Sequence, residues 1–168
     1  MSSHIAVYPI SSNPPTFGHA DILTRAANHF EQVYWAAAIN PAKSYMFTQE
    51  ERMRMMQEYV DHFQLTNVTV DAYIGATIRY VQSKGSRVIV KGLRSTDDFH
   101  PEQQQALGNA MLAPDVETFC LFGRPERFQI SSSLVRELAL LGESIEAYVL
   151  PSVARMVEDA VQRFQAQQ

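Results

Sequence analysis

The chain has 168 residues, of which 46% are hydrophobic and 19% are charged, and its formal net charge at pH 7 is −4. This length and composition predict one domain, spanning residues 1–168, and exclude a disordered chain. The negative charge argues against nucleic acid or a membrane surface as a partner, because both attract basic proteins. The single cysteine excludes an internal disulfide bond. Since we recognise no signal peptide and no transmembrane segment, we expect a cytoplasmic protein.

Short apolar runs alternate with segments of helical periodicity along the chain. Runs typical of β-strands cover residues 5–10, 33–39, 68–72, 87–91 and 116–122. Apolar residues at helical spacing predict a first helix from Leu23 to Phe30. A second helix is predicted after the N-cap Thr48, with Met53, Met56, Val60 and Phe63 on its apolar face. Further helices are predicted for residues 77–84, 102–112, 131–141 and about 152–166. Pro101 is expected to start its helix, and Cys120 is expected to be a buried strand residue.

This alternation predicts an α/β fold, a Rossmann-like five-stranded parallel sheet with helices on both faces. In open sheets of this kind, ligands bind outside the carboxyl ends of the strands. The loops after residues 10, 39, 72, 91 and 122 are therefore the places to look for a site.

The loop after the first strand contains hydroxyl groups, a glycine and an imidazole directly before a helix. It runs from Ser11 to His19 and ends in the pattern Thr-x-Gly-His. A helix N-terminus offers unpaired N–H groups to a phosphate, and His19 can donate a further hydrogen bond. Helix capping alone would explain one serine or threonine, but not the three residue types together. We therefore predict a phosphate-binding loop.

Three later segments are further candidates for anion binding. Lys43 follows the second strand, and Lys91 and Arg94 lie at the end of the fourth. Residues 131–133 are three successive serines directly before a helix. The alternatives are solvated surface charges and a simple helix cap, but placement at strand ends and at a helix start favours phosphate binding. The chain has no Walker loop, GxGxxG, GxSxG or HExxH motif.

Several segments, in order, resemble the phosphopantetheine adenylyltransferases of the nucleotidyltransferase superfamily. They are Tyr8-Pro9, Thr16-x-Gly18-His19, Asn40-Pro-Ala-Lys43, residues 46–52, Lys91-Gly-Leu-Arg94 with Asp98-Phe99, and Ile130-Ser-Ser-Ser133. The resemblance spans about residues 5–157 and implies a nucleotidyltransferase type of sheet. It also implies transfer of AMP from ATP to 4′-phosphopantetheine, which gives dephospho-coenzyme A and pyrophosphate.

The resemblance implies partners and residue roles as well. Mg²⁺ would be carried by ATP with no metal ligand from the protein, and the chain would form a homo-hexamer regulated by coenzyme A. His19, Lys43 and Lys91 would be catalytic, and Ser11, Lys43, Thr77 and Lys91 would bind the acceptor. The implied ATP-binding residues are Ser11, Ser12, His19, Gly92, Leu93, Arg94, Glu102, Arg127, Phe128, Gln129, Ile130, Ser131, Ser132 and Ser133.

The sequence departs from the family's usual pattern beside the expected substrates. The usual Gly-Thr-Phe-Asp-Pro is Ile-Ser-Ser-Asn-Pro at residues 10–14, and the usual arginine at position 91 is a lysine. Two alternatives therefore stay open. One is a related nucleotidyltransferase with nicotinate or nicotinamide mononucleotide as acceptor, and the other is a non-catalytic nucleotide- or coenzyme A-binding protein on the same fold.

Overall fold

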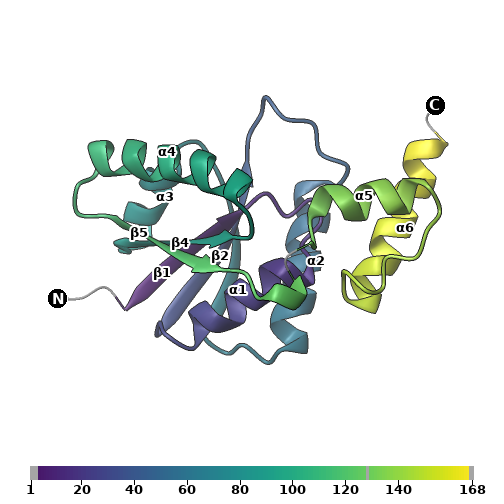
Figure 1. Cartoon of the computed structure of the whole chain (residues 1–168), viewed down its shortest axis with the longest axis horizontal. Coiled ribbons are helices and arrows are strands. Elements are labelled where there is room, and N and C mark those ends of the chain that lie inside the picture. The colour runs from purple at the N-terminus through teal and green to yellow at the C-terminus, as the bar shows by residue number, and fades with distance from the viewer. Residues whose placement is uncertain (1–3, 128, 167–168) are drawn as a thin grey trace.

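The computed structural model describes residues 4–127 and 129–166 (Figure 1). Its centre is a five-stranded sheet in which all neighbouring strands are parallel, in the order β3-β2-β1-β4-β5. The strands are β1 (Ile5–Ile10), β2 (Gln32–Ile39), β3 (Val68–Ile74), β4 (Val88–Leu93) and β5 (Glu117–Phe122). The order reverses between β1 and β4, so these two strands form the switch point of the sheet.

Helices follow each strand, as the alternating pattern predicted. They are α1 (Phe17–Ala27), α2 (Gln49–His62), α3 (Thr77–Ser83), α4 (Thr96–Leu112), α5 (Ser132–Leu140) and α6 (Pro151–Gln165). One short 3₁₀ turn, Pro125–Arg127, precedes α5. Figure 1 shows α3 and α4 together on one side of the sheet, whereas α5 and α6 extend beyond the end where α2 lies.

Alternate side chains of the buried strands pack against different sets of helices. Tyr8 and Trp35 lie in a large core with α1, α2, α5 and α6. Val7 and Ile89 point the other way, toward a smaller core with α3. Both faces of the central strands are therefore buried, which explains why their sequences are apolar without alternation. The predicted α/β fold class is confirmed.

Helix α4 begins earlier than predicted. Ser95 is its N-cap and accepts a hydrogen bond from the Asp98 N–H at 3.4 Å, so the helix starts at Thr96. Pro101 lies inside the helix rather than at its start, where it removes one backbone donor. The Ser95 cap and the acidic residues Asp97 and Asp98 in the first turn stabilise the helix start by more than the lost donor costs. The prediction that Pro101 starts the helix is therefore wrong.

Cys120 is exposed, not buried as expected, because β5 is an edge strand that the described helices do not fully cover. The stripe predicted for α2 is also shifted. Met55 and Met56 are buried in the core, whereas Met53 is half-buried and Phe63 is 38% exposed. In the part of the chain that the structure describes, no helix is both long enough and apolar enough to span a membrane.

Candidate active site

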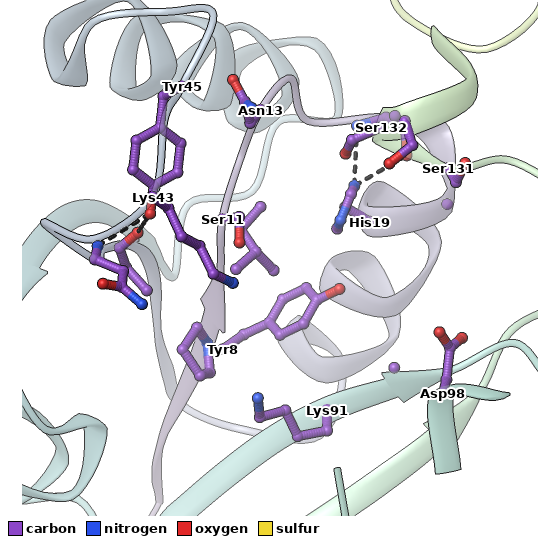
Figure 2. Close-up of a pocket in the computed structure, with 18 of the residues that line it drawn as sticks. Tyr8, Ser11, Asn13, His19, Lys43, Tyr45, Lys91, Asp98, Ser131 and Ser132 are labelled. Atoms are coloured by element: carbon purple, nitrogen blue, oxygen red, sulfur yellow. Dashed lines mark hydrogen bonds between the residues drawn. The ribbon is translucent and has the colours of Figure 1, made fainter. Parts of the chain in front are cut away.

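A pocket of about 860 Å³ opens at the carboxyl ends of the strands, beside the β1–β4 switch point (Figure 2). Loops from widely separated parts of the chain meet there, as the parallel topology requires. The predicted site residues that line it are Ser11, His19, Lys43, Thr77, Lys91, Gly92, Arg94, Glu102, Ile130, Ser131, Ser132 and Ser133.

Five predicted residues do not line this pocket or cannot be placed. Ser12 is buried beneath the loop, and Leu93 is buried in the protein core. The guanidinium group of Arg127 lies over the Phe17 ring, with its carbon 4.9 Å from the ring centre. Gln129 lines a separate small hollow beside the 3₁₀ turn, and Phe128 lies outside the described residues.

His19 lies in the first turn of α1, and its ring orientation is fixed by the helix cap. The Thr16 N–H donates to His19 Nδ1 at 3.1 Å, and the Thr16 hydroxyl lies 2.9 Å from the same atom. Since Nδ1 is an acceptor, the proton of the neutral ring is on Nε2. Burial and the nearby Arg94 guanidinium lower the pKa of His19 to about 4. At neutral pH His19 therefore presents an uncharged Nε2–H donor to the pocket, toward which it points in Figure 2.

Close backbone approach explains two glycines of the site. A Cβ at Gly18 would lie 3.3 Å from the Ile130 carbonyl oxygen, so the glycine lets α1 approach the start of α5 closely. A Cβ at Gly92 would lie only 2.8 Å from Cγ1 of Ile22, which leaves no room for a side chain. Gly18 lets α1 pack against the segment before α5, and Gly92 lets β4 pack against α1, because neither residue carries a Cβ that would clash.

Lys91 and Arg94 are positioned by acidic residues of α4. Lys91 Nζ lies 2.8 Å from Glu102 Oε2 and donates to Gln105 Oε1 at 2.9 Å. Arg94 donates from Nε and Nη2 to the two Asp98 carboxylate oxygens at 3.1 and 3.2 Å. These ion pairs fix the direction of both cations and offset part of their charge.

Arg94 also connects the end of β4 to the segment before α5. Its Nη1 donates to the Ile130 carbonyl oxygen at 2.8 Å, directly before the three serines. Ser131 is the N-cap of α5 and accepts from the Leu134 N–H, whereas the Ser132 hydroxyl donates to the Pro14 carbonyl oxygen at 2.7 Å. The start of α5 is therefore attached both to β4 and to the loop before α1.

Lys43 and Arg136 are the pocket cations for which the described residues provide no acidic partner. Lys43 is exposed on the loop between β2 and α2. Arg136 lies on α5 and donates to the Asn13 carbonyl oxygen and to Ser133 Oγ. The sequence analysis missed Arg136, although its position four residues after Ser132 places both on one face of the helix.

Arg52 is a second residue that sequence reasoning missed. It is 2% exposed, and its Nη1 donates to the Ser11 carbonyl oxygen at 2.8 Å, below the loop between β1 and α1. Its backbone carbonyl oxygen accepts from the Ser12 hydroxyl, and Ser12 adopts a left-handed φ of 50°. Its guanidinium carbon lies 4.1 Å from the centre of the Tyr45 ring. Arg52 thus holds an otherwise unfavourable loop conformation in place.

The opposite end of the pocket is lined by hydroxyl groups. Thr77 lies at the start of α3, and its Oγ1 is 2.8 Å from the hydroxyl of Tyr73 on β3. Among the described residues, no cluster of three or more His, Cys, Asp or Glu side chains could hold a metal ion. The pocket is thus lined by hydrogen-bond donors and cations near α1 and α5, and by the hydroxyl groups of Tyr73 and Thr77 near α3.

A parallel sheet with two helix N-termini facing one pocket, one of them formed by Thr-x-Gly-His, defines a nucleotidyltransferase-type α/β protein. The sequence matches the cytidylyltransferase-like family over residues 11–138. The phosphopantetheine adenylyltransferase of Synechococcus sp. (strain JA-3-3Ab) is 45% identical over 160 residues, which are 95% of this chain and 98% of the relative. That of Heliobacterium modesticaldum is 42% identical over 155 residues, which are 92% and 91% of the two chains.

The fold is shared with more distant enzymes. The solved structure of Plasmodium falciparum nicotinic acid mononucleotide adenylyltransferase complexed with NaAD matches with a TM-score of 0.68 and 14% identity, over 98% of this chain and 96% of that one. This likeness concerns the fold alone. The sequence matches show that the chain belongs to the cytidylyltransferase-like family and, within it, to the phosphopantetheine adenylyltransferases. It is accordingly an adenylyltransferase.

Proposed function

We propose that the protein transfers AMP from ATP to the phosphate of 4′-phosphopantetheine, and releases dephospho-coenzyme A and pyrophosphate. One observation carries this proposal: the neutral His19 Nε2–H donor, the start of α5 and the cations Lys43 and Lys91 all face one pocket at the switch point. Such a set suits two phosphate-bearing substrates that meet end to end.

The reaction is an in-line displacement at the α-phosphorus of ATP. An oxygen of the acceptor phosphate forms the new bond to phosphorus, and the bond from phosphorus to the oxygen bridging to the β-phosphate breaks. Pyrophosphate leaves with the electron pair of that bond, so no covalent enzyme intermediate forms. The proposed role of His19 is to donate its Nε2–H to an α-phosphate oxygen, whose charge is stabilised most in the transition state.

The remaining residues bind and orient the two substrates. In our proposal, Lys43, Lys91, Ser11 and Thr77 hold the acceptor. The nucleotide contacts Gly92, Arg94, Glu102 and residues 130–133, together with Ser11 and His19, which all line the pocket. Arg136 is added to the nucleotide side, because it lines the pocket beside Ser133 and has no carboxylate partner among the described residues. A cation at that position can neutralise the leaving pyrophosphate.

Mg²⁺ is proposed to enter with ATP. The two acidic side chains that line the described pocket, Asp98 and Glu102, lie in ion pairs with Arg94 and Lys91. The oxygen donors that suit Mg²⁺ here are therefore those of the triphosphate itself. The bound ion would neutralise charge on the phosphates, while the chain's own residues orient them.

The identity of the acceptor can be tested directly. The protein is incubated with ATP, Mg²⁺ and either 4′-phosphopantetheine or a pyridine mononucleotide, and pyrophosphate release is measured. We expect release with 4′-phosphopantetheine alone, as the names of the curated relatives suggest. Release only with nicotinate or nicotinamide mononucleotide would establish the related transferase instead. Binding of ATP and acceptor without release would establish a non-catalytic protein.

We further propose a cytoplasmic homo-hexamer for which coenzyme A is a feedback ligand. Support for assembly comes from α4, a helix of 17 residues in which none is buried in the isolated chain. Its Leu107, Met111 and Leu112 are exposed, as are Phe119 and Phe122 of the neighbouring edge strand. Large apolar side chains gathered on one surface are typical of a protein interface.

A further inference from the structure

Tyr8 is a largely buried tyrosine whose hydroxyl group has no hydrogen-bond partner among the described residues. Tyr8 lies on β1, is 3% exposed and lines the pocket. Its hydroxyl makes no hydrogen bond to any described residue, and the oxygen is not among the fully enclosed unpartnered atoms, so it reaches the pocket. Figure 2 shows the ring projecting into the pocket, in the space between His19 and Lys91. Since no described residue bonds to this hydroxyl, a phenylalanine would lose no hydrogen bond to the described part of the free protein.

The surroundings of this hydroxyl indicate an oxygen-rich ligand. It lies at the switch point, where a Cβ on Gly92 of the adjacent strand would be 3.7 Å from Tyr8 Oη. Other donors toward the same space are the His19 Nε2–H and the Lys91 ammonium group. The nearest lining carboxylates, Asp98 and Glu102, are held by Arg94 and Lys91. Burial raises the pKa of Tyr8, so the group remains a protonated donor at neutral pH.

We propose that the Tyr8 hydroxyl is a substrate-binding group, which donates a hydrogen bond to a phosphate oxygen of a ligand at the β1–β4 switch point. The proposal rests on the proposed function in one respect: the phosphate belongs either to ATP or to the acceptor. The two sources share the same chemistry, and separate binding measurements distinguish them. A hydrogen bond to a charged phosphate oxygen is stronger than one between neutral groups.

The test is Tyr8→Phe, which removes one oxygen and keeps the ring. Calorimetry gives the Kd for ATP with Mg²⁺ and, separately, for 4′-phosphopantetheine, and thermal unfolding gives the Tm without ligand. We expect the affinity for one of the two ligands to fall roughly tenfold or more. The Tm of the free protein should change little, because the hydroxyl makes no hydrogen bond to a described residue.

Tyr59→Phe is the matched control. Tyr59 is also buried, but its hydroxyl donates to the Pro15 carbonyl oxygen and accepts from the Leu150 N–H, and it does not line the pocket. We expect this variant to lower the Tm and to change both Kd values by less than about twofold. The control thus gives the result expected for a hydroxyl that stabilises the folded protein but does not bind a substrate: a lower Tm with unchanged affinities.

Two outcomes would overturn the proposal. One is a Tyr8→Phe variant whose Kd values for both ligands equal those of the wild type, and the other is a Tm loss as large as that of Tyr59→Phe. Failure of the proposed function looks different. If the wild type bound ATP but released no pyrophosphate with 4′-phosphopantetheine, the transfer reaction would be wrong, whereas a weaker ATP affinity of Tyr8→Phe would still support the Tyr8 proposal.

Discussion

The chemistry of His19 follows from two neighbours. The Thr16 N–H donates a hydrogen bond to His19 Nδ1. Burial of the ring and the nearby positive charge of Arg94 lower the pKa of His19 to about 4, so the ring is neutral at pH 7. A neutral imidazole with its proton on Nε2 is a hydrogen-bond donor that carries no charge of its own. It can therefore stabilise charge that develops in the transition state without binding the ground-state triphosphate strongly.

Replacement of His19 by alanine tests this role. We expect His19→Ala to lower kcat roughly 10²- to 10³-fold, while the Kd for ATP changes less than about threefold, since the lost donor acts mainly in the transition state. Steady-state pyrophosphate release and calorimetry give the two numbers. The exposed His29, at the far end of α1, is the control, and His29→Ala should behave as wild type. Equal losses in kcat and in ATP affinity would contradict a transition-state role.

At the level of elements, the start of α2 connects the C-terminal helix to the loop between β1 and α1. The Thr48 hydroxyl accepts from the Glu51 N–H at 3.2 Å, and Glu51 Oε2 accepts from the Thr48 N–H at 2.9 Å. Glu51 also forms an ion pair with Arg163 of α6. The next residue, Arg52, holds the Ser11 carbonyl oxygen. One turn of helix thereby supports both a packing contact and a binding loop.

This helix start gives the stability a defined pH dependence. Burial alone raises the pKa of Glu51, but hydrogen bonds with Thr48 and the contact with Arg163 outweigh it, so the pKa lies below its usual 4.5. A lowered folded pKa contributes stability that is present above pH 4.5 and is lost as the pH falls through the folded value. We expect Glu51→Gln to lower the Tm by about 2–4 °C at pH 7 and to match the wild type well below pH 4.5.

The control for this measurement is Glu50→Gln. Glu50 is exposed in the same first turn, so it shares the favourable position near the helix N-terminus without the contacts of Glu51. Its effect on the Tm should be smaller. A Tm difference between wild type and Glu51→Gln that is the same at pH 7 and in acid would show that the charge of Glu51 contributes nothing.

At the scale of the whole molecule, an acidic protein concentrates its binding cations in one pocket. The net charge is −4, yet four lysine and arginine side chains from three segments line the switch-point pocket. The surface away from the pocket has a different feature, the exposed apolar side chains of α4 and β5. The pocket cations suit the small phosphate-bearing substrates that we propose. The exposed apolar side chains suit the assembly that we propose.

Assembly can be tested by placing a charge on the apolar surface. Met111 is 86% exposed, and Met111→Glu should reduce the mass measured by light scattering from a hexamer to smaller species. The reason is that burial of an unpaired carboxylate costs several kcal/mol at each contact. Leu141 is also exposed but follows α5, and Leu141→Glu serves as the control. An unchanged mass for Met111→Glu would exclude α4 from the interface.

Local patterns in the sequence predicted the five strands, the parallel fold class and the segments that meet in the pocket. These follow from local patterns: apolar runs, helical periodicity, and the Thr-x-Gly-His and triple-serine starts of two helices. Where two local signals competed, as with Ser95 and Pro101 in α4, the structure decided for the cap. Local chemistry can be predicted in this way because each signal depends on residues a few positions apart.

Only the tertiary structure decided which groups face one another. Long-range strand pairing puts β5 at an edge, so Cys120 is exposed although its neighbours are apolar. The same pairing brings Arg136 into the pocket, Arg52 beneath the loop, and the unpaired Tyr8 hydroxyl to the switch point. The physical reason is that hydrogen-bond partners and burial depend on segments far apart in the chain, whose relative positions no local pattern encodes.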